Sequence, residues 1–454
     1  MKLTKSSELL LEFFKNHKCI PVVSSNNISK KIFRTLYSDI CDANNYLESV
    51  KRERNGMLYK KTIQHIKSKN DLPAFKNFPS NIFTKEVQHH IDVNMKLIVR
   101  YSLQMFNRKI NIHFIIGRKD YKDSDSKTLK YEKYVNCILL WTYILNKYSS
   151  IHCSKDWNIY LYFTSLEKQL PNKNIHLQDN ILNYNHINTG FTTTCPQISE
   201  IVIFRKEEWF KVFIHESFHN FALDFSDMNV TELNKAVLDI FPIKTDGNLF
   251  EAYTEFWAEM INICFCSYFY LKQGPVDGFD GFLSNVDILL QYERIYSFFQ
   301  LNKVLHYMGL TYKNVYSKDK TSAVLRETLY KENTNIFAYY VVKCILINNY
   351  NGFLSWCYQH NVGGVGGNII QFSKTQQNLY DFYLFIKKNY KTASFENNVD
   401  CMEKYMLKWQ KKLYFYTGHG NNGGGDGDGD DGKVNYSQLY YLVNNMRMSI
   451  FELE

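Results

Sequence analysis

The stretch Phe213-Ile214-His215-Glu216-Ser217-Phe218-His219-Asn220 contains the pattern H-E-x-x-H, and the rest of the chain is interpreted around it. Residues four apart lie one above the other on a helix, so His215 and His219 can point imidazole nitrogens at one metal ion. Glu216 is rotated from His215 by about 100° and lies beside that ion, where a carboxylate can accept a proton from water. The stretch therefore predicts two metal ligands and a general base on one helical turn.

The surroundings of this motif predict an amphipathic helix over residues 206–225. Its apolar stripe has the spacing of a core-facing helix side and consists of Phe210, Phe213, Ile214, Ser217 and Phe221. His215 and His219 lie on roughly the opposite side, which is also where solvated histidines are found. Two surface histidines with an unrelated glutamate are therefore an alternative interpretation of the same motif.

A second helix supplies candidates for a third ligand. Residues 248–271 predict a long helix that begins after Asp246-Gly247, and Glu251, Glu255 and Glu259 share one of its faces. A catalytic zinc ion usually has three protein ligands, so one carboxylate of this row could complete a His-His-Glu set while the next holds a ligand histidine by its other nitrogen. The alternative is a solvated acidic face at a helix N-terminus. Because the other positions are apolar almost all round, we expect the acidic row to have partners.

The two motifs resemble those of the gluzincins, zinc metallopeptidases with H-E-x-x-H on one helix and a glutamate ligand on the next. The segment Phe250-Glu251-Ala252-Tyr253-Thr254-Glu255 matches their second motif. The resemblance implies one Zn²⁺ per chain, held by His215, His219 and Glu251. It also implies that Glu216 is the general base and that Glu255 is the carboxylate that holds a ligand histidine by its other nitrogen.

The resemblance covers residues 190–270 and has limits. The chain has no motif of the Gly-x-Met-Glu-Asn kind, which disfavours the large aminopeptidase branch, and no clear match for the family's oxyanion-stabilising His or Tyr. Candidates for that donor are Tyr339, Tyr340 and His360, and packed or surface side chains are the alternative for each. The Asn-, Lys-, Tyr- and Ile-rich composition is similar to that of uncharacterised zinc peptidases of large DNA viruses, which would place the protein in a virion or host cytoplasm.

The expected fold class is α+β, with a zincin-like core of a small mixed sheet and the active-site helix. Before that helix we expect, in order, a helix over 83–107, a strand over 109–117, a helix over 126–148 and strands over 157–164, 190–194 and 200–205. The candidate sheet edge, to which an extended peptide substrate could add as a strand, is Gly190, Phe191, Thr192, Thr193 and Thr194. An ordinary hairpin loop is the alternative interpretation of this segment.

The domain organisation is expected to have five parts. These are a helical N-terminal region (1–80), a zincin N-terminal subdomain (81–225), a helical C-terminal subdomain with the third ligand (226–417), a Gly/Asp-rich flexible linker (418–433) and a C-terminal helix (434–454). The N-terminal region is either a separate domain or a covering segment, and Cys41 within it could block the zinc as a pro-segment thiol. In the C-terminal subdomain the later helices are expected over 286–308, 321–331, 333–348, 373–390 and 398–416.

Composition excludes several classes of function. The net charge is +9, but the lysines are dispersed and no nucleic-acid-binding module is recognisable, so no nucleic-acid partner is indicated. No stretch reaches the length of an apolar membrane span, and residues 1–20 lack the apolar core of a signal peptide. The ten cysteines form no C-x-x-C pair, so we expect reduced thiols in an intracellular, cytoplasmic protein.

The predicted function is that of a zinc metallopeptidase, an endopeptidase acting on a peptide or protein substrate. Two alternatives stay open: a zincin-fold protein without turnover that serves as a structural or host-interaction component, and a helical interaction protein in which H-E-x-x-H is accidental. The presence of Glu216 favours the enzyme over the inactive form. Substrate specificity and oligomeric state are left open by the sequence.

Overall fold

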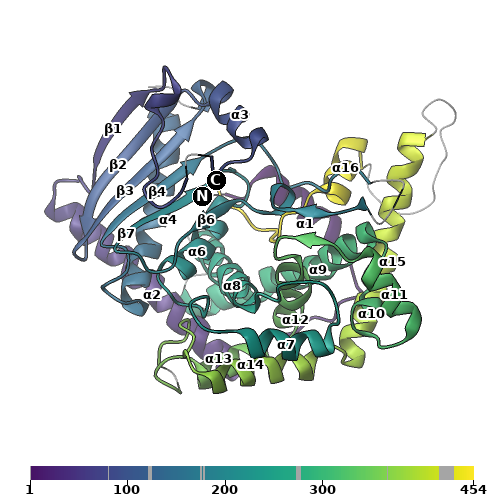
Figure 1. Ribbon diagram of the computed structural model, residues 1–454. Helices are drawn as coiled ribbons and strands as arrows, with labels where there is room; N and C mark the ends of the chain where they lie inside the picture. The colour runs from purple at the N-terminus through teal and green to yellow at the C-terminus, as the bar shows by residue number, and fades with distance from the viewer. Residues whose placement is uncertain are drawn as a thin grey trace.

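The structure is a computed structural model, which describes residues 2–79, 81–120, 125–173, 176, 179–271, 278–365, 367–418 and 434–454. It is a mixed α and β molecule in which a twisted sheet lies beside a large helical part (Figure 1). Of the predicted linker, only Gly418 belongs to the described residues. Among the described helices, none combines the length and the apolar composition needed to cross a bilayer.

The sheet has six strands with both parallel and antiparallel neighbours. In spatial order they are β1 (Lys60–His65), β2 (Leu97–Met105), β3 (Arg108–Ile116), β4 (Asp156–Tyr162), β7 (Ile198–Ile203) and β6 (Gly190–Thr192). The strands β3, β4 and β7 are parallel, whereas β6 runs antiparallel to β7 at the end of the order. The strands expected over 109–117, 157–164, 190–194 and 200–205 are confirmed in place, although β6 ends at Thr192.

Both faces of the sheet are covered, because its central strands are apolar on both sides. One face packs on α4 (Asp125–Tyr148), the crossover between β3 and β4, and on α6 (Trp209–Asn220). The other face packs on α3 (Lys85–Asn94) and on aromatic side chains of the segment before it, among them Phe75. The H-E-x-x-H motif on α6 thus lies inside the molecule, between the sheet and the helical part (Figure 1).

The helical part surrounds α8 (Leu249–Leu271), which is apolar almost all round and almost entirely buried. Its described elements are α7 (Thr231–Ile240), α9 (Gly278–Met308), α10 (Tyr312–Tyr316), α11 (Lys320–Leu329), the π-helical η4 (Phe337–Val342), α12 (Lys343–Asn348), α13 (Tyr350–His360), α14 (Gln376–Asn389), α15 (Ala393–Gly418) and α16 (Tyr436–Asn444). The helices α6, α9 and η4 pack directly on α8. The predicted helix over 248–271 is confirmed.

The prediction of one helix over 83–107 is wrong. The helix α3 ends at Asn94, and β2 follows as the partner of β3 in a hairpin. Two residues, Phe106 and Asn107, connect the strands with φ of 50° and 60°. Positive φ at both positions is the signature of the tight turns that join antiparallel strands, and the sequence interpretation did not recognise it.

The N-terminal region, residues 1–80, packs against the rest of the chain, and it is not entirely helical. It contains α1 (Lys5–Phe14) and α2 (Asn27–Glu53), but β1 pairs with β2 at the far edge of the sheet. The long helix α2 packs against α4, α8 and α13. The N-terminal region therefore contacts both the sheet and the helical part.

The prediction of a helix over 434–454 holds only for its first part. The helix α16 ends at Asn444, and residues 446–454 run without helix through the interior to the N-terminus, where Leu3 and Leu453 form an isolated antiparallel bridge. Buried carboxylates accept the hydrogen bonds that a helix would have satisfied internally. Glu208 accepts from the backbone N–H groups of Met448 and Ser449, and Glu293 from those of Ile450 and Phe451.

The prediction that all cysteines are reduced is wrong for four of them. The structure pairs Cys19 with Cys401 and Cys153 with Cys195. Cys41, on α2, belongs to neither disulfide and lies close enough to Tyr268 to add to the rise in the pKa of that phenol that burial causes. Tyr268 is 17 positions along α8 from Glu251, which is about 25 Å at the helical rise. Cys41 is therefore far from the histidine motif.

Candidate metal centre

The helix α6 carries the motif into the core. Phe213 and Phe221 lie against Trp157 of β4, with ring centroids 5.7 and 5.0 Å apart, and Phe210 lies against Phe265 of α8. The predicted apolar stripe is thus confirmed. The opposite side of α6 faces α8 rather than solvent, so the interpretation as surface histidines is wrong: His215 is 6% exposed.

Three candidate ligands converge between α6 and α8. The ligand atoms of His215, His219 and Glu251 all lie within 4.8 Å of one another. The Glu251 Oε2 atom is 3.1 Å from His215 Nε2 and 3.4 Å from His219 Nε2, and the two Nε2 atoms are 3.2 Å apart. These three residues could hold a metal ion.

The other ring nitrogen of each histidine faces a buried carboxylate. His215 Nδ1 lies 2.9 Å from Glu255 Oε2, and His219 Nδ1 hydrogen-bonds to Asp224 Oδ2. An ionised carboxylate only accepts hydrogen bonds, so each imidazole donates its Nδ1 proton outward. When both imidazoles are neutral, their Nε2 lone pairs therefore point at Glu251. Two ring nitrogens and one carboxylate oxygen then meet, and all three accept hydrogen bonds while none donates. Such a donor set fits a cation, and two imidazoles with one carboxylate are a common ligand set for zinc.

The charge balance of the site favours bound positive charge. Burial lowers the pKa of His219, but Asp224 and Glu251 raise it, and the result lies well above the ordinary value. Burial likewise lowers the pKa of His215 while Glu251 and Glu255 raise it above its ordinary value. Burial raises the pKa of Glu251, yet the two imidazoles hold it below its usual range. Protons at these nitrogens or a metal ion between them would supply the missing cation.

Glu251 is itself fixed by neighbours from the helical part. The Tyr339 hydroxyl on η4 donates to Glu251 Oε2 at 2.8 Å, and the Asn335 side-chain amide donates to Glu251 Oε1 at 3.1 Å. The Asn248 amide in turn donates to Asn335 Oδ1 at 2.9 Å. The third candidate ligand is therefore held in one orientation from two sides.

A chain of buried charges supports Glu255. The Lys211 ammonium on α6 pairs with Glu255 and lies 3.9 Å from Glu208, whose carboxylate pairs with Lys168 at 2.7 Å. Burial raises the pKa of Glu255, but Lys211 and His215 lower it well below its usual range. The carboxylate thus stays ionised and keeps accepting from His215. Glu259, the third member of the acidic row, pairs with Lys343 at 2.8 Å, so each carboxylate of the row has a partner as expected.

Glu216 stands beside the three candidate ligands and against the sheet edge. A Cβ atom added to Gly190 at the start of β6 would lie 3.0 Å from Glu216 Oε1 and 3.1 Å from its Cγ. Glycine at this position therefore lets the edge strand approach the carboxylate. Burial raises the pKa of Glu216, and the positive histidines lower it, with a net rise above the ordinary value. A rise of that kind suits a general base that must also carry a proton.

The predicted edge strand is anchored at its end by Asn220, the residue after His219. Its side-chain amide donates to Thr192 Oγ1 at 2.9 Å and to the Thr193 carbonyl at 3.2 Å, and its oxygen accepts from Ser154 Oγ at 2.6 Å. Thr193 and Thr194 follow β6 rather than belong to it.

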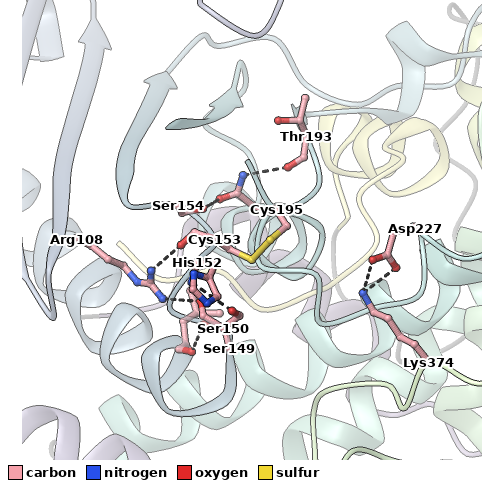
Figure 2. The surroundings of a disulfide bond; sticks show 12 residues. Arg108, Ser149, Ser150, His152, Cys153, Ser154, Thr193, Cys195, Asp227 and Lys374 are labelled. Carbon is pink, nitrogen blue, oxygen red and sulfur yellow. Dashed lines mark hydrogen bonds and ion pairs between the residues drawn. A yellow bond between two sulfur atoms is a disulfide. The ribbon is translucent and has the colours of Figure 1, made fainter. Parts of the chain in front are cut away.

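The Cys153–Cys195 disulfide ties this same corner to the loop before β4 (Figure 2). Arg108 at the start of β3 donates to the carbonyls of Cys153 at 2.6 Å and Ser150 at 3.0 Å. The Cys195 backbone N–H donates to the Asn220 carbonyl at 3.2 Å. The end of α6, the end of β6 and the loop before β4 are therefore linked covalently and by hydrogen bonds.

Of the three candidates for an oxyanion donor, only Tyr339 lies at the site. The Tyr340 hydroxyl donates to the Met446 carbonyl at 2.6 Å in the interior. His360 stacks on Trp356 at the end of α13, with ring centroids 4.7 Å apart. Neither of these two residues is brought to the metal centre.

Several residues of the site were not identified from the sequence. Asp224 lies five positions after His219, beyond the end of α6, where no helical spacing applies. Lys211 did carry a signal, because a lysine four positions before His215 interrupts an otherwise apolar first half of the helix. Asn335 comes from a distant loop, and nothing in its local sequence marks it.

Comparison with known proteins does not assign the site to a family: no protein-family model matches the chain, and neither a curated protein nor a solved structure was found that matches it.

Proposed function

We propose that this chain is a gluzincin-like zinc metallopeptidase that hydrolyses internal peptide bonds with Glu216 as general base. The observation that carries the proposal is the convergence of His215, His219 and Glu251, with both Nδ1 atoms engaged by Glu255 and Asp224. Two imidazoles and one carboxylate are a ligand set that catalytic zinc sites use. The expected zincin-like core, with a mixed sheet edge beside the motif helix, is part of the proposal.

A bound zinc ion would supply a Lewis acid and would lower the pKa of water toward neutrality. Glu216 would accept a proton from that water and hand it to the leaving nitrogen, because its carboxylate lies beside the ligands and against Gly190. Burial raises the pKa of the Tyr339 phenol, as does Glu251, so its hydroxyl stays protonated and able to donate. In this structure that single O–H group donates to Glu251 Oε2, so Tyr339 would have to turn from Glu251 to stabilise the negative oxygen that forms on the carbonyl.

The sheet edge gives the substrate a place to bind. The strand β6 is the last in the order, three residues long, and begins beside Glu216. A peptide in extended conformation could add to this edge through backbone hydrogen bonds, with its scissile carbonyl near the ligands. The hydrogen bonds of Asn220 to Thr192 and Thr193 would keep the edge in register with α6.

The test is cleavage of a peptide library by zinc-loaded protein, with and without a chelator, analysed by mass spectrometry. We expect cleavage that the chelator abolishes and zinc restores, and none by Glu216→Gln protein that retains its zinc. A protein that binds zinc but cuts no peptide would favour the alternative of an inactive zincin-fold component. A protein that binds no zinc would favour the other alternative, a helical interaction protein in which H-E-x-x-H is accidental.

A further inference from the structure

Glu208, the residue directly before α6, has an unusual backbone conformation for a buried glutamate. It is 1% exposed, and its φ of 56° lies in the left-handed region that residues other than glycine seldom adopt. Its carbonyl accepts from the Val212 N–H at 2.9 Å, and its own N–H donates to Glu452 Oε1 at 3.0 Å. Such a conformation persists where neighbouring groups impose it, so the partners of the side chain show what holds it.

The Glu208 carboxylate does not cap α6 but joins the C-terminal segment (residues 446–454) to buried cations. It accepts from the backbone N–H groups of Met448 at 3.0 Å and Ser449 at 2.8 Å. Its Oε2 atom pairs with the Lys168 ammonium at 2.7 Å, and its Oε1 atom lies 3.9 Å from the Lys211 ammonium. The start of α6 is therefore fixed to the C-terminal segment by one side chain.

Four buried charges connect this point to a candidate metal ligand. The four-charge network consists, in order, of Lys168, Glu208, Lys211 and Glu255. Each of these side chains is 2% exposed or less, and the two positive and two negative charges cancel, as burial requires. Burial raises the pKa of Glu208, but Lys168 and Lys211 lower it to about 2, so its carboxylate stays ionised. At the other end of the network Glu255 Oε2 lies 2.9 Å from His215 Nδ1.

The balance of this network protects the hydrogen bond to His215. Lys211 contacts Glu255 Oε1, whereas His215 contacts Oε2. Without the charge of Glu208, two buried ammonium groups would face Glu255 as the one carboxylate left in the network. Each ammonium has three N–H donors, and these would compete with His215 for Oε2. An imidazole that loses this acceptor is free to carry its proton on Nε2, the atom that would bind the metal.

We propose that Glu208 is a positioning residue of the metal centre. Through Lys211 and Glu255 it keeps His215 in the orientation and tautomer that bind a metal ion. It also makes that orientation depend on the C-terminal segment, whose N–H groups hold its carboxylate. The inference rests on the proposed function, but of that function it requires only that the centre binds zinc.

Glu293 on α9 provides a matched control. It is fully buried and accepts from the Ser449 hydroxyl and from the backbone N–H groups of Ile450 and Phe451. It therefore anchors the same C-terminal segment with the same chemical group, from a helix that carries none of the candidate ligands. Loss of anchoring alone would affect variants of both glutamates, whereas loss of support for His215 would affect only those of Glu208.

The experiment measures the zinc Kd of the full-length protein by competition with a chelating indicator, together with the melting temperature of the metal-free protein. Glu208→Gln and Glu293→Gln should both lower the melting temperature, because each weakens the hold on buried N–H groups. Only Glu208→Gln should raise the zinc Kd, by about ten-fold, the lower end of the range for groups behind a ligand. Glu208→Asp keeps the charge, and aspartate tolerates positive φ, so its zinc Kd should lie closer to the wild-type value.

A double variant tests the route through Lys211. Lys211→Met should also raise the zinc Kd by about ten-fold, and adding Glu208→Gln to it should change the Kd little further, because both changes break one network. Additive effects, about a hundred-fold together, would overturn the route. If Glu208→Gln protein does not fold, Lys211→Met decides alone: a raised zinc Kd supports the proposal, and a wild-type Kd overturns it.

The failure of the inference and that of the proposed function can be told apart. A wild-type zinc Kd in folded Glu208→Gln protein, or an equal rise in Glu293→Gln protein, overturns the inference alone. Wild-type protein that binds zinc but cuts no peptide overturns the proposed peptidase, while the zinc Kd values still decide on Glu208. Wild-type protein that binds no zinc overturns both.

Discussion

The carboxylate of Asp224 provides a sharp test of the proposed centre, because the sequence pattern did not identify it. It is fully buried, and its Oδ2 atom accepts from His219 Nδ1 and, at 3.2 Å, from the Thr254 hydroxyl. Its Oδ1 atom accepts from the Ser226 backbone N–H at 2.8 Å. Both oxygens therefore face donors only, and water does not reach them.

The change Asp224→Asn keeps the shape of the side chain but replaces one oxygen with an NH₂ group. If that group faces His219, the imidazole must move its proton to Nε2, the atom that would bind the metal. If it faces Ser226 instead, two buried donors oppose each other. Loss of a carboxylate behind a ligand histidine typically weakens metal binding by about 10- to 100-fold, or about 1.4–2.7 kcal/mol, and the lack of water at this position places our expectation at the upper end.

The assay is a competitive zinc titration against a chelating indicator, together with the thermal unfolding of the metal-free protein. Asp227→Asn is the matched control, since that carboxylate lies three positions on, is exposed and pairs with Lys374. We expect a higher zinc Kd for Asp224→Asn and a wild-type Kd for Asp227→Asn. A wild-type Kd and an unchanged melting temperature in Asp224→Asn protein would refute the role given to Asp224.

Three further changes have defined outcomes. Glu216→Gln should abolish peptide hydrolysis and leave zinc content unchanged by atomic absorption, and loss of zinc would make Glu216 a ligand instead. Glu251→Ala should lower zinc content sharply and Glu255→Ala less, since the first removes a ligand and the second its support, and the reverse order would move the third ligand to Glu255. Replacing both Cys153 and Cys195 with serine opens a loop of 42 residues and should lower the free energy of unfolding by about 4 kcal/mol in urea titrations, whereas an unchanged value would mean that this pair does not form in solution.

Local periodicity predicted the two helix faces of the site, and the choice of Glu251 within the acidic row came from the resemblance to the gluzincins. The i, i+4 spacing places His215 and His219 on one face of α6, and the same spacing places Glu251 and Glu255 on one face of α8. Both are properties of a single helix and need no knowledge of tertiary structure. The inference that the acidic row must have partners followed from the apolar character of α8, and the ion pairs of Glu255 and Glu259 confirm it.

The failures have a common physical cause, which is dependence on partners distant in sequence. The strand β2 was taken for a helix because its apolar residues fit the periodicity of a helix as well as that of a strand. Only its pairing with β3 across the Phe106-Asn107 turn makes it a strand. The C-terminal segment was also predicted to be a helix. Its actual form depends on hydrogen bonds to Glu208 and Glu293, which are more than 150 residues away, so the local sequence could not reveal it. Asn335 reaches Glu251 across 84 positions and cannot be found from spacing.

The most direct test of the central claim is a crystal structure of the zinc-loaded protein with data collected on both sides of the zinc absorption edge. We predict one anomalous peak per chain, about 2.0–2.1 Å from the Nε2 atoms of His215 and His219 and within bonding distance of a Glu251 oxygen. A protein that retains no zinc after dialysis, or a peak coordinated by other side chains, would contradict the claim that these two helices form a metal centre.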